Sequence, residues 1–194
     1  MGVGPTALLG VDGGGATAID LALARPDLVT ALVLVAPRLT GWQPPGWNLA
    51  LILEKMAPVM LALERAMATG DPTDFIAAGM DDPAAMPAHA AARERVRAML
   101  TGNIHLYLPP FSPPPLPTDP PASQRLDAIH APTLILVGER DNPLYREVSE
   151  KVAAGIAGAR LVVVPDAPRL MNMERPEEFN RIVLDFLRDA VEPA

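Results

Sequence analysis

The sequence predicts an α/β fold with a single core and an inserted helical region. Two strand–helix–strand units support this prediction, one near the start of the chain and one near its end. The strands in both units are apolar throughout, which is typical of parallel strands buried on both faces of a sheet. Because helices alternate with these strands, we expect a mainly parallel sheet with flanking helices on both faces.

The first unit lies within the first 36 residues. The apolar run TALLGV (Thr6–Val11) predicts a buried strand. A helix is expected over Gly14–Ala24, ending before Pro26 because proline cannot continue a helix. The run ALVLVA (Ala31–Ala36) predicts the second strand.

The second unit closes the chain. PTLILVG (Pro132–Gly138) predicts a strand, a helix follows over Leu144–Ile156, and ARLVVVP (Ala159–Pro165) predicts the last strand. Pro176 suits the first turn of a final helix, whose apolar side chains recur at helical spacing. These apolar residues are Phe179, Ile182, Val183, Phe186 and Leu187.

The region between the two units has a different character. Helices are expected over Asn48–Ala68, Thr73–Met80 and Pro87–Leu100. The segment Leu108–Pro121 then holds eight of the 23 prolines, which favours a stiff, extended connection back to the sheet.

The predicted organisation is therefore a core interrupted by a cap. Residues 1–40 and 131–194 are expected to form the core, and residues 41–130 the helical cap with its proline-rich return. A chain of 194 residues with 49% hydrophobic content is long enough to bury one core.

Composition narrows the functional classes. A net charge of -7 without a basic stripe argues against nucleic acid as a partner. With no cysteine and three scattered histidines, neither a thiolate nucleophile nor a metal centre is expected, and we expect no cofactor. The lack of cysteine fits a reducing cytoplasm, where we expect the protein to be located. No apolar stretch approaches the ~20 residues that span a bilayer, so we expect a soluble protein without membrane contact.

The sequence Gly10-Val11-Asp12-Gly13-Gly14 joins the first strand to its helix and resembles the nucleophile elbow of the α/β-hydrolase family, Gly-x-nucleophile-x-Gly. The apex residue of that elbow has a strained backbone, so its neighbours two positions away must be small. Gly10 and Gly14 satisfy this requirement. Gly13 is expected to offer its N–H as half of an oxyanion hole.

The resemblance extends over most of the chain in the family's order. In GERD after the third strand, Asp141 stands where the family has its triad acid, and VVVPDAPRLMNMERPEEF is similar to the family's closing segment. The cap stretch GDPTDFIAAGMDDPAAMPAHAAARERVRAMLTGN resembles that of bacterial enol-lactone and carbon–carbon bond hydrolases. The resemblance implies a partial α/β-hydrolase fold and an ancestral activity on small ester or lactone substrates.

Three departures from the family pattern follow. Asp12 replaces serine at the apex, and Arg169, preceded by Pro168, replaces histidine in the closing turn. The sequence also begins at the elbow strand, so the family's earlier strands and the loop with the second oxyanion donor are missing from it. We therefore expect a fragment or a catalytically impaired member whose altered triad is Asp12, Asp141 and Arg169.

One alternative is an active hydrolase with Asp12 as the nucleophile. Haloalkane dehalogenases and epoxide hydrolases have an apex aspartate that attacks carbon and forms an ester. Those families usually place tryptophan next, where this chain has Gly13, and epoxide opening favours cap tyrosines, of which only Tyr107 is present. Tyr145 follows the third strand instead. A small apolar or acyl compound is the expected substrate of an active form.

The missing general base weighs against turnover. A guanidinium with a pKa above about 12 cannot accept a proton, so Arg169 cannot replace the histidine. His130 precedes the third strand, on the side of the sheet away from the elbow. His89 and His105 belong to the cap, and no motif supports either as a base.

Non-catalytic alternatives also remain. GGGATA (Gly13–Ala18) matches a dinucleotide fingerprint, and Arg38 after the next strand suits a 2′-phosphate, although the ribose-binding acid is missing. A binding or partner protein is another alternative, since the elbow strand TALLGV is expected to have one unpaired edge. That edge favours a homodimer, a separate front-half partner or poor solubility.

The sequence finally predicts what Asp12 does if it is not a nucleophile. Arg169 is expected to lie between Asp12 and Asp141, because the three positions meet in the family's triad. Two neighbouring carboxylates repel each other, and a guanidinium with five N–H donors can satisfy both. Asp12 and Arg169 would then be coupled replacements that form a structural ion pair.

Overall fold

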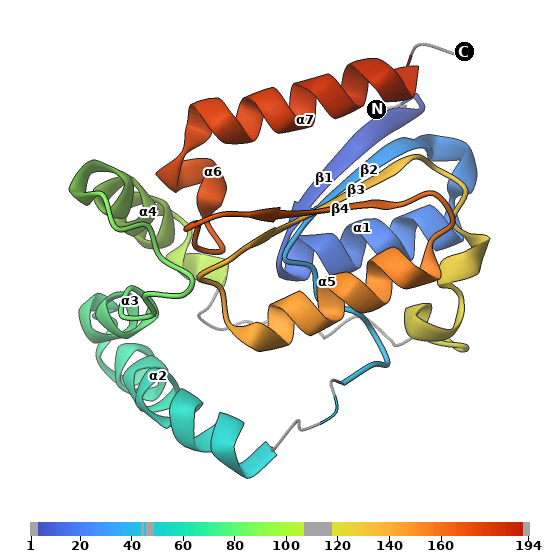
Figure 1. Ribbon diagram of the computed structural model, residues 1–194. Coiled ribbons are helices and arrows are strands. Elements are labelled where there is room, and N and C mark those ends of the chain that lie inside the picture. The colour runs from blue at the N-terminus through green and yellow to red at the C-terminus, as the bar shows by residue number, and fades with distance from the viewer. Residues whose placement is uncertain (1–3, 44, 46–48, 107–117, 192–194) are drawn as a thin grey trace. The chain divides into compact units, whose positions relative to one another are not determined.

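The computed structural model describes residues 4–43, 45, 49–106 and 118–191 (Figure 1). It divides into two compact units. Met1–Pro44 and Leu116–Ala194 form the first, named here the core unit, and Pro45–Pro115 form the second, the cap unit.

The core unit contains the predicted parallel sheet. Its strands are β1 (Thr6–Val11), β2 (Val29–Val35), β3 (Thr133–Gly138) and β4 (Arg160–Val164), arranged in the order β1-β2-β3-β4. All three pairings are parallel. Each strand overlaps a predicted apolar run, so the expected mainly parallel α/β sheet is confirmed.

Helices cover both faces of this sheet (Figure 1). α1 (Gly13–Ala24) and α5 (Pro143–Gly155) lie on one face. α6 (Met171–Glu174) and α7 (Pro176–Val191) lie on the other. The apolar side chains divide in the same way into two buried clusters, because successive strand residues point to opposite faces.

The central and outer strands differ in exposure. β3 is buried along its whole length and β2 at all but one residue, whereas most of β1 and β4 is exposed or half-buried. Within the described residues β1 pairs only with β2, and Leu9 in β1 is 50% exposed. β1 is therefore an edge strand of the sheet as described.

The cap unit is helical, as predicted. It contains α2 (Leu49–Thr69), α3 (Thr73–Gly79), α4 (Ala90–Gly102) and the short 3₁₀ turn Ile104–Leu106. α4 begins three residues after the predicted start at Pro87, with His89 at its N-cap.

The expected end of the insertion at residue 130 needs correction. Two short 3₁₀ turns, Ala122–Gln124 and Leu126–Ala128, belong to the core unit. Ala122, Leu126 and Ile129 are buried in the cluster beneath α1 and α5, so apolar burial draws this segment to the core. The first part of the proline-rich run, through residue 117, and the cap tyrosine Tyr107 lie outside the described residues.

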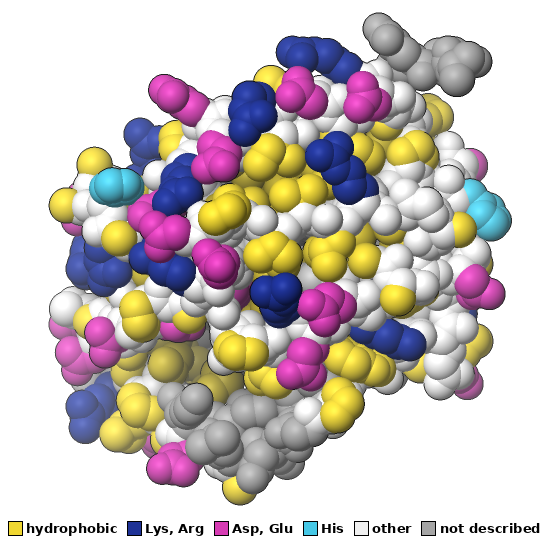
Figure 2. All heavy atoms as spheres, in the orientation of Figure 1, with side chains coloured by type: hydrophobic (Ala, Val, Ile, Leu, Met, Phe, Trp, Pro, Cys, Tyr) yellow, Lys and Arg dark blue, Asp and Glu magenta, His cyan; other side chains and the backbone are white. Residues whose placement is uncertain are grey.

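One face of the molecule shows charges of both signs. On the face shown in Figure 2, basic and acidic side chains alternate among apolar ones and do not form a patch of one sign. In the described part of the chain, no helix combines the length and apolarity needed to cross a membrane.

Candidate functional site

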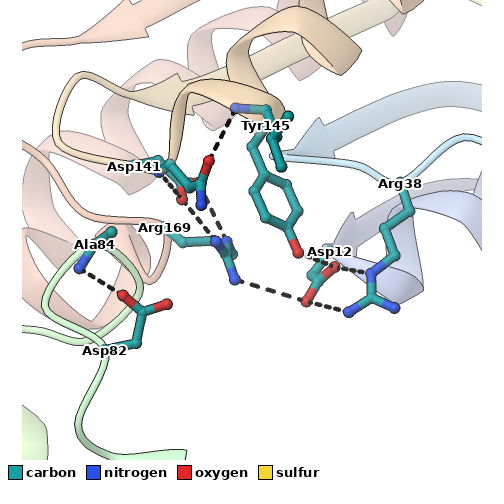
Figure 3. A network of polar contacts seen from close by, with 9 residues as sticks. Asp12, Arg38, Asp82, Ala84, Asp141, Tyr145 and Arg169 are labelled. Carbon is teal, nitrogen blue, oxygen red and sulfur yellow. Dashed lines mark hydrogen bonds and ion pairs between the residues drawn. The ribbon is translucent and has the colours of Figure 1, made fainter. Parts of the chain in front are cut away.

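Four charged side chains follow the carboxyl ends of the four strands (Figure 3). Asp12 follows β1, Arg38 follows β2, Asp141 follows β3 and Arg169 follows β4. Because the strands are parallel, these ends lie at one edge of the sheet, where open α/β folds commonly place their ligands. All four residues belong to the core unit.

The elbow is visible in the backbone of Asp12. Its φ of 52° and ψ of -115° are uncommon for a residue with a side chain. Its N–H donates to the carbonyl of Val35 at 2.9 Å, and its carbonyl accepts the N–H groups of Gly15 at 3.0 Å and Arg38 at 3.1 Å. Main-chain bonds to β2 and α1 therefore hold the apex in place.

The glycines of the elbow have unequal roles. A Cβ at Gly10 would collide with the backbone of Gly14 and Gly15, as the elbow pattern predicts. A Cβ at Gly14 would meet nothing within 4 Å, so the expected packing role of Gly14 is corrected. Gly15 needs to be small instead, because its Cβ would lie 2.8 Å from the side chain of Pro37.

Asp141 and Arg169 form the buried half of the site (Figure 3). Arg169 donates from Nη2 to Oδ1 of Asp141 at 2.8 Å and from Nε to Oδ2 at 3.2 Å. The Asp141 side chain is 0% exposed and that of Arg169 is 12% exposed. Burial lowers the pKa of Arg169, but the bonds to Asp141 outweigh it, so the net pKa lies above the ordinary value.

The turn that carries Arg169 is held tightly against β3. A Cβ at Gly138 would collide with the carbonyl of Ala167, so only glycine allows this approach. Asp166 has a φ of 50° and donates its N–H to the Glu139 carboxylate at 2.9 Å. Arg175 donates to the Pro165 carbonyl at 3.0 Å. These contacts hold the backbone of the turn and so determine the position from which the Arg169 side chain extends.

Arg38 is the closest ionic partner of Asp12. Its Nε donates to Oδ1 at 2.6 Å, and its Nη2 reaches Oδ2 at 3.4 Å. The Arg38 side chain is 65% exposed and that of Asp12 is 29% exposed. Burial lowers the pKa of Arg38, but the hydrogen bonds that Arg38 donates to the Asp12 carboxylate and the negative charge of that group raise it, so the net pKa lies above the ordinary value.

Tyr145, in the first turn of α5, joins the two halves of the site. Its hydroxyl donates to Oδ1 of Asp12 at 3.1 Å, and the guanidinium carbon of Arg169 lies 3.6 Å from its ring centroid. That geometry is a cation–π contact. Burial raises the pKa of the Tyr145 phenol, partly opposed by the positive charge of Arg169.

The expected ion pair of Asp12 with Arg169 is present, but each of the two residues has a shorter ion pair with another partner. Arg169 does lie between the two carboxylates, but its Nη1 is 4.0 Å from Oδ2 of Asp12, at the limit of an ion pair. Arg169 is committed to Asp141, and Asp12 is bound chiefly by Arg38 and Tyr145. The pattern VAPR at the end of β2 was a usable signal for Arg38, because it places a cation at the same sheet edge.

The other chemical groups considered from the sequence are the N–H of Gly13 and the three histidines. Within the described chain no hydrogen bond is assigned to the N–H of Gly13, the expected oxyanion donor. His130 is exposed and precedes β3, at the opposite edge of the sheet from Asp12. The two remaining histidines, His89 and His105, belong to the cap unit.

The described residues do not form a prepared set of ligands for a metal or a dinucleotide. The described residues contain no group of three or more side chains suited to holding a metal ion. Arg38, suggested for a 2′-phosphate, is bonded to Asp12, and that carboxylate precedes the N-terminus of α1, where a pyrophosphate would bind. The network is therefore internally paired, with two cations and two carboxylates.

A parallel sheet with a strained residue between strand and helix, and charged groups at the following strand ends, defines a hydrolase-type α/β fold. A family model described as the alpha/beta hydrolase family matches residues 2–182. The chain therefore belongs to that family.

Known relatives agree with this assignment. The chain is 27% identical over 191 residues to a 2-hydroxy-6-oxononadienedioate/2-hydroxy-6-oxononatrienedioate hydrolase of Pseudomonas putida, covering 93% of this chain and 62% of the relative. A thermophilic esterase from Thermogutta terrifontis matches with a TM-score of 0.68 and 25% identity, over 97% of this chain and 66% of the esterase. An N-acyl homoserine lactone degrading enzyme matches with a TM-score of 0.61 and 25% identity, over 95% of this chain and 68% of that enzyme.

The chain spans about three-fifths of the length of such curated relatives.

Proposed function

We propose that this chain is a non-hydrolytic member of the alpha/beta hydrolase family, derived from hydrolases of small ester or lactone substrates. The observation that supports the proposal is the bidentate bond between Arg169 and the buried Asp141. In a working triad that carboxylate orients a histidine, which takes up a proton. Here it orients a guanidinium that has no proton-accepting nitrogen.

The surroundings of Asp12 also disfavour hydrolysis. Its carboxylate receives hydrogen bonds from Arg38 and Tyr145, which stabilise its negative charge and so weaken it as a nucleophile. If it attacks an alkyl carbon, it displaces halide or opens the C–O bond of an epoxide and forms an ester, and hydrolysis of that ester needs a base to activate water. Arg169 cannot supply that base.

Turnover assays test this proposal directly. Aryl esters, lactones, epoxides and haloalkanes should all persist in the presence of the protein. The Asp12→Ser/Arg169→His double variant restores the residue types of a serine hydrolase triad and serves as the positive comparison. Steady wild-type turnover that disappears in Asp12→Ala would overturn the proposal.

A second candidate is an active hydrolase with Asp12 as its nucleophile. Asp12 has the positive φ of an elbow apex, and the Tyr145 hydroxyl lies beside it, where it could donate to an epoxide oxygen. Intact-mass spectrometry after exposure to styrene oxide separates the candidates. A stable adduct lost in Asp12→Asn indicates a nucleophile without a base, whereas diol release indicates the active enzyme.

We also propose that the outer edge of β1 pairs with another strand, from a second copy or from a front-half segment that supplies the preceding strands of the family sheet. Edge strands present unpaired N–H and C=O groups, and β1 adds the exposed Leu9. A lysine on an edge strand disfavours such pairing. The variant Leu9→Lys should therefore reduce self-association in sedimentation velocity.

Leu184→Lys is the matched control, because Leu184 on α7 is 49% exposed and lies outside the sheet. A wild-type monomer at tens of micromolar that also fails to bind a front-half fragment of a family member would contradict the pairing proposal.

We propose a cytoplasmic location for the protein, and fractionation of the source cells would test it.

A further inference from the structure

The cap unit contains an apolar cavity of its own. Its volume is about 200 Å³. Residues from α2, α3, α4 and the loop between α3 and α4 line it, and all of them belong to the cap unit. The lining residues are Val59, Phe75, Ile76, Gly79, Met86 and Leu100.

The apolar side chains that line this cavity favour an apolar ligand. None of the six residues has a polar side chain, so water or an ion would find no side-chain hydrogen-bond partner there. An enclosed apolar cavity of about 150 Å³ binds benzene. The cavity in the cap unit is larger and partly open to solvent, so a ligand can enter without unfolding of the helices. The Phe75 ring and the Met86 sulfur are groups that make favourable contacts with an aromatic ring.

The glycine in the wall increases the available space. A Cβ at Gly79 would meet nothing within 4 Å, so this position, at the end of α3, adjoins open volume. Ile76, one turn earlier on the same helix, is buried. The other lining residues are half-buried. A larger residue at position 79 would extend into this volume without a backbone clash.

We propose that the cap unit binds a small, neutral, single-ring aromatic molecule in the cavity between α2, α3 and α4. Binding removes the apolar surfaces of ligand and wall from water, which is the driving force. The proposal is independent of hydrolysis and of the state of Asp12, because every lining residue lies in the cap unit.

The test is a titration of the full chain with toluene, followed by methyl NMR. The resonances of Ile76 and Met86 should shift saturably in the wild type. Gly79→Leu fills the cavity from α3 and should weaken binding at least about tenfold, which corresponds to the loss of ~1.4 kcal/mol. Val59→Phe fills it from α2 and should have the same effect.

Gly102→Leu is the matched control. Gly102 ends α4, a Cβ there would also meet nothing within 4 Å, and the residue does not line the cavity. The affinity of the Gly102→Leu variant for toluene should equal that of the wild type. Unchanged wild-type methyl resonances at saturating toluene would overturn the proposal. Binding of toluene by both Gly79→Leu and Val59→Phe with the wild-type affinity would also overturn it, provided that far-UV circular dichroism shows both variants to be folded.

Discussion

Arg169 and Arg38 hold two aspartates at the same edge of the sheet with similar geometry but different burial. Each uses Nε and Nη2 on one carboxylate. The pair of Arg169 with Asp141 is withdrawn from solvent, whereas Arg38 is 65% exposed. A buried charge that loses its partner stays desolvated, but an exposed one is rehydrated. Similar hydrogen bonds should therefore contribute very differently to stability.

The largest expected effect is the difference between the two arginines. Arg169→Met leaves the Asp141 carboxylate buried without its cation and should lower the free energy of unfolding by about 3–5 kcal/mol. Arg38→Met, the matched control, should lower it by no more than about 1 kcal/mol. Urea unfolding measures both values. Equal losses would show that burial does not distinguish the two pairs.

A double-mutant cycle sharpens the comparison. Combining Arg169→Met with Asp141→Asn should give a coupling energy of about 1–3 kcal/mol, because the two side chains are in direct contact. The parallel cycle of Arg169→Met with Asp12→Asn should couple by less than about 0.5 kcal/mol, since those groups are 4.0 Å apart at their closest. A larger coupling in the second cycle would show that the longer Asp12–Arg169 pair also stabilises the fold.

Tyr145 provides a smaller effect that separates its hydroxyl from its ring. Tyr145→Phe removes the hydrogen bond to Asp12 and should cost about 0.5–1.5 kcal/mol of unfolding free energy. Tyr145→Leu also removes the ring beneath Arg169 and should cost about 0.5–2 kcal/mol more. If both variants lose the same amount, the cation–π contact contributes nothing measurable.

The smallest expected effect is on alkaline stability. Burial raises the pKa of Tyr145 in the folded protein, so between the unfolded and folded pKa values the native state holds a proton that the unfolded state has lost. Its contribution to stability is complete below about pH 10 and is lost as pH rises through the folded pKa. Urea unfolding across this range should show a steeper decline for wild type than for Tyr145→Phe. Identical slopes would contradict the raised pKa.

The fold was predictable because its strands are apolar almost without interruption. Runs such as ALVLVA and TLILV fit no exposed element, and they became the central strands β2 and β3. The end of the helical insertion was harder to predict from the sequence, because the burial of Ala122, Leu126 and Ile129 depends on tertiary packing that no local pattern indicates.

The site was predictable only where a motif marked it. Asp12, Asp141 and Arg169 came from their places in the elbow, the GERD turn and the closing turn, and the structure brings them together. For Arg38 the pattern VAPR indicates only a cation at this sheet edge, and its bond to Asp12 depends on which strand lies beside β1. Tyr145 is 133 residues away from Asp12, and its contact depends on the rotation of α5, which the sequence does not specify.

The backbone of the elbow has one further consequence. The carbonyl of Asp12 accepts N–H groups from Gly15, Ala16 and Arg38, and none of these bonds involves the Asp12 side chain. The conformation of the turn therefore does not depend on the chemical type of the side chain at its apex. A substitution at position 12 can therefore change the chemistry of the site without removing the main-chain bonds that hold the turn.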